Sequence, residues 1–184
     1  FSALALYGDL EQRERDETLL QFANQSCSVL VATDVAARGL DISSLSAVIN
    51  VDVSKDTEVH IHRVGRTGRA GDKGLALCLA SPSENKWVKL IEQYQGRPVE
   101  WFDLPEPEAG SEPLQAPMVT LNIFGGKKDK LRPGDILGAL TGEAGIPAAK
   151  IGKINVFEFY SYVAVARDVA QLALTRLSNG QIKG

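Results

Sequence analysis

Val29-Leu-Val-Ala-Thr-Asp-Val-Ala-Ala-Arg-Gly-Leu-Asp41 joins a continuous apolar run to a polar segment that contains a glycine. An apolar run without polar alternation is typical of a strand buried on both faces of a parallel sheet. In open α/β sheets, ligands bind beyond the carboxyl ends of such strands. Four polar residues stand in that position: Thr33, Asp34, Arg38 and Asp41. They are candidate ligand contacts, or else the caps and ion pair of an ordinary strand-to-helix turn.

Strand-like and helix-like segments alternate on both sides of this stretch. Further strands are predicted at residues 3–7, 47–53 and 75–80, and helices at residues 10–24, 57–64 and 82–95. Asp9 with Gln12 and Ser81 with Glu84 have the spacing of helix capping boxes. This alternation predicts an α/β lobe with a parallel sheet covered by helices.

A change in composition predicts where the lobe ends. Residues 104–116 contain three prolines and three glutamates and almost no large apolar side chain, which favours an extended linker. Residues 1–116 carry 11 Lys and Arg against 18 Asp and Glu, whereas residues 117–184 carry 9 against 5. We therefore expect a lobe at residues 1–103, a linker at 104–116 and a basic tail at 117–184 that binds a polyanion.

The tail has a different order of elements. Strands are predicted at residues 119–124, 151–156 and 160–165, and helices at 133–144 and 168–177. The order strand, helix, strand, strand, helix lacks only a final strand of the four-stranded RNA-recognition fold. We expect an α+β domain of that kind, without its last strand.

His62-Arg-Val-Gly-Arg-Thr-Gly-Arg-Ala-Gly71 is the strongest chemical signal in the lobe. Its three arginines, Arg63, Arg66 and Arg69, are spaced by three, so one helical turn brings them toward one face. Arginine carries a planar, permanent charge that suits phosphate oxygens. The alternative is a surface cluster that pairs with nearby carboxylates.

Two groups of residues in the tail are candidates for RNA binding. Gly125-Gly-Lys-Lys-Asp-Lys-Leu-Arg132 places Lys127, Lys128, Lys130 and Arg132 beside a helix N-terminus, where phosphates bind readily. Tyr160 and Tyr162 share one strand face, where an RNA-recognition domain stacks bases, and Lys153 is expected on the same open face. The loop could instead be a solvated lysine loop, and the tyrosines could merely cover the sheet.

Together, the segments at 32–41 and 62–71 resemble two motifs of the DEAD-box RNA helicases, and Gly8-Asp-Leu-Glu-Gln-Arg-Glu-Arg15 resembles a third. The resemblance implies a RecA-like lobe in which Arg66 and Arg69 contact the γ-phosphate of ATP as arginine fingers. It implies that Asp41 contacts the ribose. It also implies an RNA-backbone surface made of these residues: Gln12, Arg15, Thr33 and Gly39.

A phosphate-binding G-x-x-x-x-G-K-[ST] loop and an Asp-Glu-Ala-Asp sequence are absent from the 184 residues. In the family these belong to a first lobe that also binds Mg²⁺. We therefore expect a fragment whose lobe is incomplete at its N-terminus and which does not hydrolyse ATP alone.

The lobe and tail together are similar to the bacterial DbpA/YxiN type, which implies binding to a hairpin of large-subunit ribosomal RNA during ribosome assembly. Three alternatives remain: a general DEAD-box RNA helicase, a non-catalytic RNA-binding adaptor, and a DNA-directed helicase of the same superfamily.

Composition argues against several other classes. Cys27 and Cys78 lie in apolar runs and are expected to be buried, reduced thiols, and no His/Cys cluster suggests a metal site. No apolar stretch is long enough to cross a bilayer, and no signal peptide is recognisable. A cytoplasmic protein that does not bind membranes is expected.

Overall fold

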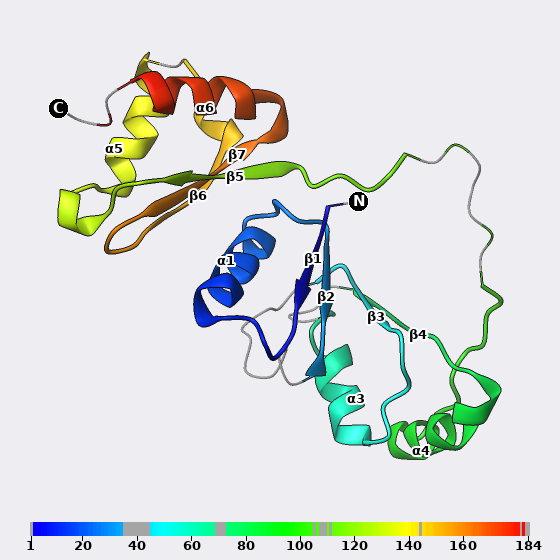
Figure 1. Cartoon of the computed structure of the whole chain (residues 1–184). Helices are drawn as coiled ribbons and strands as arrows, with labels where there is room; N and C mark the ends of the chain where they lie inside the picture. Colours follow the sequence, from blue (N-terminus) through cyan, green and yellow to red (C-terminus); the bar gives the residue numbers. More distant parts are fainter. Residues whose placement is uncertain are drawn as a thin grey trace. The chain divides into compact units, whose positions relative to one another are not determined.

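The computed structural model describes residues 2–34, 45–68, 73–104, 106, 110, 112–143, 145–180 and 182 (Figure 1). The chain divides into two compact units. One unit combines residues 1–37 with residues 112–184, and the other comprises residues 38–111. The chain passes from the second unit back to the first within the predicted linker. The domain boundaries at 103/104 and 116/117 stay predictions.

The first unit begins with a parallel strand pair. Strand β1 (Ala3–Leu6) pairs in parallel with β2 (Val29–Ala32), and helix α1 (Gln12–Ala23) connects them. The predicted cap was wrong, because the helix begins two residues later than expected. The Glu14 carboxylate accepts the backbone N–H of Glu11 at 3.2 Å, so Glu11 takes the capping position in place of Asp9.

The second unit also contains a parallel pair, β3 (Ala47–Asn50) with β4 (Leu75–Cys78). Asp56 caps the N-terminus of helix α3 (Thr57–Val64), because its carboxylate accepts the N–H of Glu58 at 2.8 Å. A 3₁₀ turn (Pro82–Glu84) leads into α4 (Asn85–Gln95). The predicted capping interaction is present there, because Glu84 accepts the backbone N–H of Ser81 at 2.9 Å. Val53, Val88 and Ile91 form the buried core of this unit.

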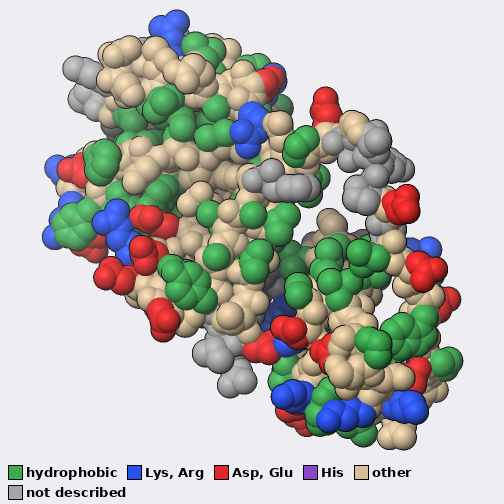
Figure 2. Space-filling model, turned by 45° about the vertical axis from the view of Figure 1, so that its right-hand side comes forward, with side chains coloured by type: hydrophobic (Ala, Val, Ile, Leu, Met, Phe, Trp, Pro, Cys, Tyr) green, Lys and Arg blue, Asp and Glu red, His purple; other side chains and the backbone are tan. Residues whose placement is uncertain are grey.

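The parallel pairing was predicted, but burial of the strands on both faces was not observed. Val31 of β2, Ile49 of β3 and Leu75 of β4 are exposed, and hydrophobic side chains are visible over much of the surface in Figure 2. Cys27 is buried as expected, whereas Cys78 on β4 is exposed. Within the described residues each strand of these pairs has one hydrogen-bonded neighbour.

The tail forms an antiparallel sheet in the order β5-β7-β6, with β5 at Met118–Ile123, β6 at Ile151–Val156 and β7 at Ser161–Ala166. Helices α5 (Pro133–Gly138) and α6 (Ala170–Asn179) lie on one side of this sheet in Figure 1. The predicted helix at residues 133–144 changes to a π-helical turn at Ala139–Glu143. The predicted order of elements is confirmed, with three strands among the described residues of the tail.

The helices and the sheet of the tail enclose one core. Ile136 and Leu140 on the helical side and Val163 and Val165 on β7 are fully buried, together with Ala173 of α6. Since successive residues of a strand point to opposite faces, Tyr162 and Ala164 lie on the face away from these helices. Packing of the core therefore determines that Tyr162 lies on the sheet face opposite the helices.

Candidate nucleic-acid interface

The arginine-rich segment begins on α3, and its first arginine anchors that helix. Arg63 Nη1 donates to Asn50 Oδ1 at 3.3 Å and to the Asp52 carbonyl oxygen at 2.9 Å. Both acceptors lie at the carboxyl end of β3, where ligands bind in α/β sheets. Arg63 therefore fixes α3 beside that end of the strand.

Arg66 follows the end of α3 and is partly exposed. Its carbonyl accepts the N–H of Leu45 at 3.1 Å, and the Thr67 hydroxyl donates to the Leu45 carbonyl. These contacts fix the backbone of the segment at Arg66 and Thr67. Arg69, Asp41 and Gly39, the other predicted ATP and RNA contacts of the lobe, lie outside the described residues.

A buried histidine connects α3 to α4. His60 and Gln95 place their Nε2 atoms 3.2 Å apart, and His60 is buried. Burial lowers the pKa of His60 below its ordinary value, and the nearby Arg63 charge lowers it further. The neutral imidazole is therefore favoured at this contact between the two helices.

Thr33 lies at the carboxyl end of the β1–β2 pair, and Gln12 and Arg15 lie in the first turns of α1. Leu6 pairs with Ala32 at the carboxyl ends of both strands, so Thr33 follows that end directly. Thr33 N donates to the Leu6 carbonyl at 3.1 Å and its side chain is exposed. Gln12, in the first turn of α1, donates through Nε2 to Asp16 at 2.7 Å. Gln12 and Arg15 thus share one helix, Thr33 directly follows β2, and their RNA contacts stay predictions.

The basic loop, residues 125–132, is held by its backbone and exposes its cations. Gly126 N donates to Asp129 Oδ2 at 2.9 Å, and Arg132 N donates to Asp135 Oδ2 at 2.9 Å. Four cationic side chains are exposed: Lys127, Lys128, Lys130 and Arg132. A fixed backbone with exposed cations is suited to phosphate contact, because less backbone entropy is lost on binding.

The predicted stacking face contains the two tyrosines, but helix α1 contacts it. Tyr162 is 6% exposed and its hydroxyl donates to Glu17 Oε1 at 2.8 Å. The same carboxylate accepts from Arg13 Nε at 3.0 Å, and the Arg13 guanidinium lies 5.8 Å from the centre of the Tyr160 ring. Lys153, on β6, is exposed.

These contacts shift the pKa of both partners. Burial, and then the Glu17 hydrogen bond, raise the pKa of Tyr162 to about 12. The hydroxyl of Tyr162, and then Arg13, hold the pKa of Glu17 below its ordinary value. Base stacking on Tyr162 would require α1 to leave this face, so the tyrosine role stays a prediction.

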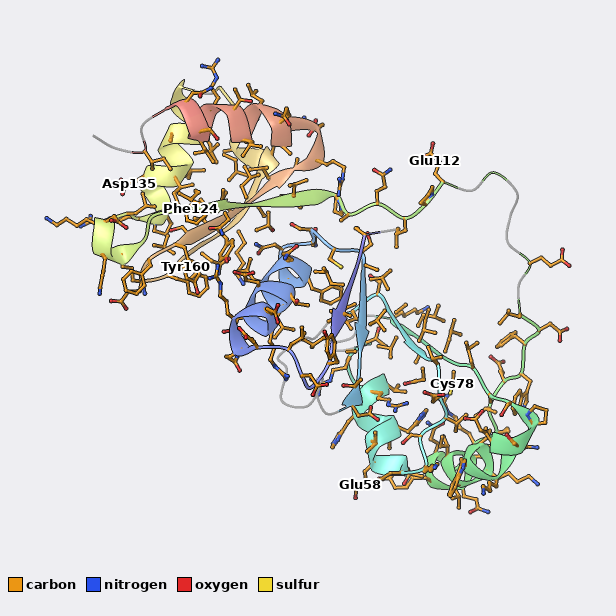
Figure 3. All side chains as sticks on the ribbon, viewed as in Figure 1. Glu58, Cys78, Glu112, Phe124, Asp135 and Tyr160 are labelled. Carbon is orange, nitrogen blue, oxygen red and sulfur yellow. The ribbon has the colours of Figure 1, made fainter. Side chains whose placement is uncertain are left out.

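The sequence interpretation missed three residues on this face. Phe157 lies 5.3 Å from Tyr160 and 6.0 Å from Tyr162, measured between ring centroids, and completes an aromatic cluster. Figure 3 labels Tyr160 within it. Arg13 and Glu17 were also missed, although their spacing of four on a predicted helix is a signal for an ion pair.

Within the described residues, no group of three or more His, Cys, Asp or Glu side chains is arranged to bind a metal ion. The same part of the chain contains no helix of the length and apolar character needed to cross a membrane.

Comparison with known proteins gives matches for both parts of the chain. A family model described as the helicase conserved C-terminal domain matches residues 1–71, and one described as the DbpA RNA binding domain matches residues 120–184. Among solved structures, the Escherichia coli DEAD-box protein SrmB, bound to regulator of ribonuclease activity A, is 36% identical with a TM-score of 0.51. That similarity covers 58% of this chain and 65% of the SrmB chain in that structure.

Two curated relatives match nearly the whole chain. It is 52% identical over its full length to the ATP-dependent RNA helicase DbpA of Escherichia coli K12, of which it covers 40%. It is 32% identical over 97% of its length to the ATP-dependent RNA helicase DbpA of Bacillus subtilis 168, of which it covers 42%. The chain spans about two fifths of each relative. It therefore belongs to the DbpA type of DEAD-box proteins, with part of the helicase C-terminal domain followed by the RNA-binding domain.

Proposed function

We propose that the chain acts as part of an ATP-dependent RNA helicase, in which the tail binds a hairpin of large-subunit ribosomal RNA during assembly of that subunit. The observation that carries the proposal is the basic loop, whose exposed cations lie within the region that matches the RNA-binding family model. The names of both curated relatives support the helicase activity. A cytoplasmic site of action follows from the proposed RNA.

The ATP part of the proposal assigns a defined task to the arginine-rich segment. Arg66 and Arg69 would bind the γ-phosphate, and Asp41 would bind the ribose. Among these three, Arg66 is the one that the structure describes, and its guanidinium suits a phosphate oxygen. ATP would supply the energy for RNA remodelling, while Mg²⁺ would be bound by a first lobe outside this sequence.

On the lobe, Gln12, Arg15 and Thr33 are proposed to bind the RNA backbone, together with Gly39. Contacts with phosphate and sugar position a protein but carry no base information. The lobe would therefore act on many sequences, and the tail would select the RNA. In a general RNA helicase without a ribosomal target, the tail would show no preference among hairpins, and this difference can be measured.

The test compares binding of the full chain to two RNA hairpins with the same stem, one with a large-subunit ribosomal loop and one with a shuffled loop. We expect tighter binding to the ribosomal loop. Replacing Lys127, Lys128 and Lys130 with alanine should weaken binding to both RNAs. The slope of log affinity against log salt concentration should also become shallower by roughly 0.7 for each lysine that contacts a single-stranded phosphate.

Lys89→Ala is the matched control, because Lys89 is an exposed lysine on α4, far from the tail in sequence. It should bind both hairpins as the parent does. Equal binding of the two hairpins by the parent would contradict the ribosomal target. Unchanged binding by the triple lysine variant would contradict the RNA-binding role of the loop.

A further inference from the structure

The basic loop and the β6–β7 turn, residues 157–160, form one continuous surface at the end of the tail. Lys127 N donates to the Phe157 carbonyl at 2.8 Å, and Lys128 N donates to the Glu158 carbonyl at 3.1 Å. The Ser161 hydroxyl donates to the Gly125 carbonyl at 2.7 Å, and Ser161 is fully buried. Two segments about thirty residues apart in sequence are therefore fixed to each other through their backbones.

Gly126 makes this close contact possible. A Cβ atom at this position would lie 2.5 Å from the carbonyl oxygens of both Phe157 and Glu158. Side chains do not tolerate such a distance to backbone atoms, so any other residue would push the two segments apart. The glycine allows the lysines to lie directly beside the turn.

Two exposed phenylalanine rings lie in or directly next to these segments. Phe124, between β5 and the basic loop, is 95% exposed, and Phe159, in the turn, is 61% exposed. The Lys128 Nζ atom lies 4.4 Å from the centre of the Phe159 ring. Figure 3 labels Phe124, and Figure 2 shows hydrophobic side chains beside both basic and acidic side chains at the left edge of the molecule.

Exposed aromatic rings among cations fit one kind of partner better than others. A phenylalanine ring offers a flat apolar face to which any nucleic-acid base can stack. Neighbouring lysines attract the phosphates of the same strand. The tail carries 9 Lys and Arg against 5 Asp and Glu, so its charge also favours a polyanion. An unpaired RNA segment satisfies both features, whereas the bases of an intact duplex are not available for stacking.

We propose that Phe124 and Phe159 stack unpaired RNA bases, while Lys127, Lys128 and Lys130 bind the phosphates of the same segment. This inference rests on the proposed RNA-binding function of the tail. It assigns base stacking to a surface separate from the sheet face, on which α1 contacts the tyrosines. The stacking residues would then lie at the end of the sheet and not on its face.

The test measures binding of the full chain to two labelled RNAs of equal length and charge. One is a hairpin with an unpaired seven-nucleotide loop, and the other is a duplex without unpaired bases. Phe124→Ala and Phe159→Ala should each weaken binding to the hairpin by ~5-fold or more, as expected for loss of one stacked base. Both should leave duplex binding unchanged.

Three comparisons make the result decisive. Phe102→Ala removes a ring that is 75% exposed in the other unit, and it should bind as the parent does. Phe124→Trp, which keeps an aromatic face, should retain hairpin binding. Stacking is not electrostatic, so the phenylalanine variants should keep the parent's salt slope, in contrast to the lysine variants.

The two possible failures can be distinguished. If the lysine variants bind RNA as the parent does, the RNA-binding role proposed for the loop is wrong. If the lysine variants lose affinity but both phenylalanine variants bind the hairpin within twofold of the parent, the stacking inference is wrong. In that case the rings serve another partner, such as a protein.

Discussion

At the scale of single residues, Arg63 and Arg66 of the 62–71 segment have different environments and should have different roles. Arg63 is bound to Asn50 and to the Asp52 carbonyl, so its guanidinium is used within the fold. Arg66 is partly exposed beyond the end of α3. The even spacing of the arginines does not distinguish Arg63 from Arg66. The acceptors of Arg63 come from β3 and the segment that follows it, and the spacing carries no information about them.

The first prediction concerns Arg66. In a protein that joins this chain to a complete first lobe, Arg66→Ala should reduce ATP turnover by about 10³–10⁵-fold, the typical value of an arginine finger. RNA binding by the tail should persist. Steady-state ATPase assays give the turnover, with Arg97→Ala as a control because Arg97 is exposed in the same unit. Turnover within threefold of the parent would exclude the finger role.

At the scale of elements, the order and pairing of strands were predictable because apolar runs and helical periodicity are local signals. The first residue of α1 was harder, since Asp9 and Glu11 both precede residues that could complete a cap. Exposure of β2 and β4 was not predictable, because an apolar run shows what a strand could bury and not what covers it. The contact of Tyr162 with Glu17, 145 residues away in sequence, has no local signal.

The second prediction tests that contact between α1 and the sheet. Because the folded pKa of Tyr162 is raised from 10.0 to about 12, its stabilising effect is fully present below pH 10 and is lost as pH rises through about 12. Glu17→Ala should lower the pKa of Tyr162 toward 10, since it exposes the phenol and removes its acceptor. Titration of the tyrosine ring signals by NMR measures this shift, with Asp16→Ala as a control because Asp16 is an exposed carboxylate on the same helix.

A Tyr162 pKa near 10 in the parent would show that α1 does not contact the sheet face in solution. The same measurement bears on RNA binding. If α1 covers Tyr162 in the free protein, RNA can stack on this ring only after α1 has moved away. Hairpin RNA would then break the Tyr162–Glu17 hydrogen bond and change the Tyr162 ring signals if it used the sheet face, and would leave both unchanged if it used the loop.

At the scale of the whole molecule, the sequence predicted the combination of a helicase lobe with an RNA-binding tail, because motifs and a change in net charge are visible in it. It did not predict that the basic loop and the β6–β7 turn form one surface. That contact depends on Gly126 and on backbone atoms of the turn, and backbone hydrogen bonds between distant segments have no residue signature.

The central claim is that the tail delivers the lobe to a chosen RNA, and RNA-stimulated ATP hydrolysis tests it most directly. In the protein joined to its first lobe, RNA with the large-subunit hairpin should stimulate hydrolysis at much lower concentration than the same RNA without it. Alanine at Lys127, Lys128 and Lys130 should abolish this advantage while leaving the maximal rate intact. Equal half-stimulating concentrations for the two RNAs in the parent would contradict the claim.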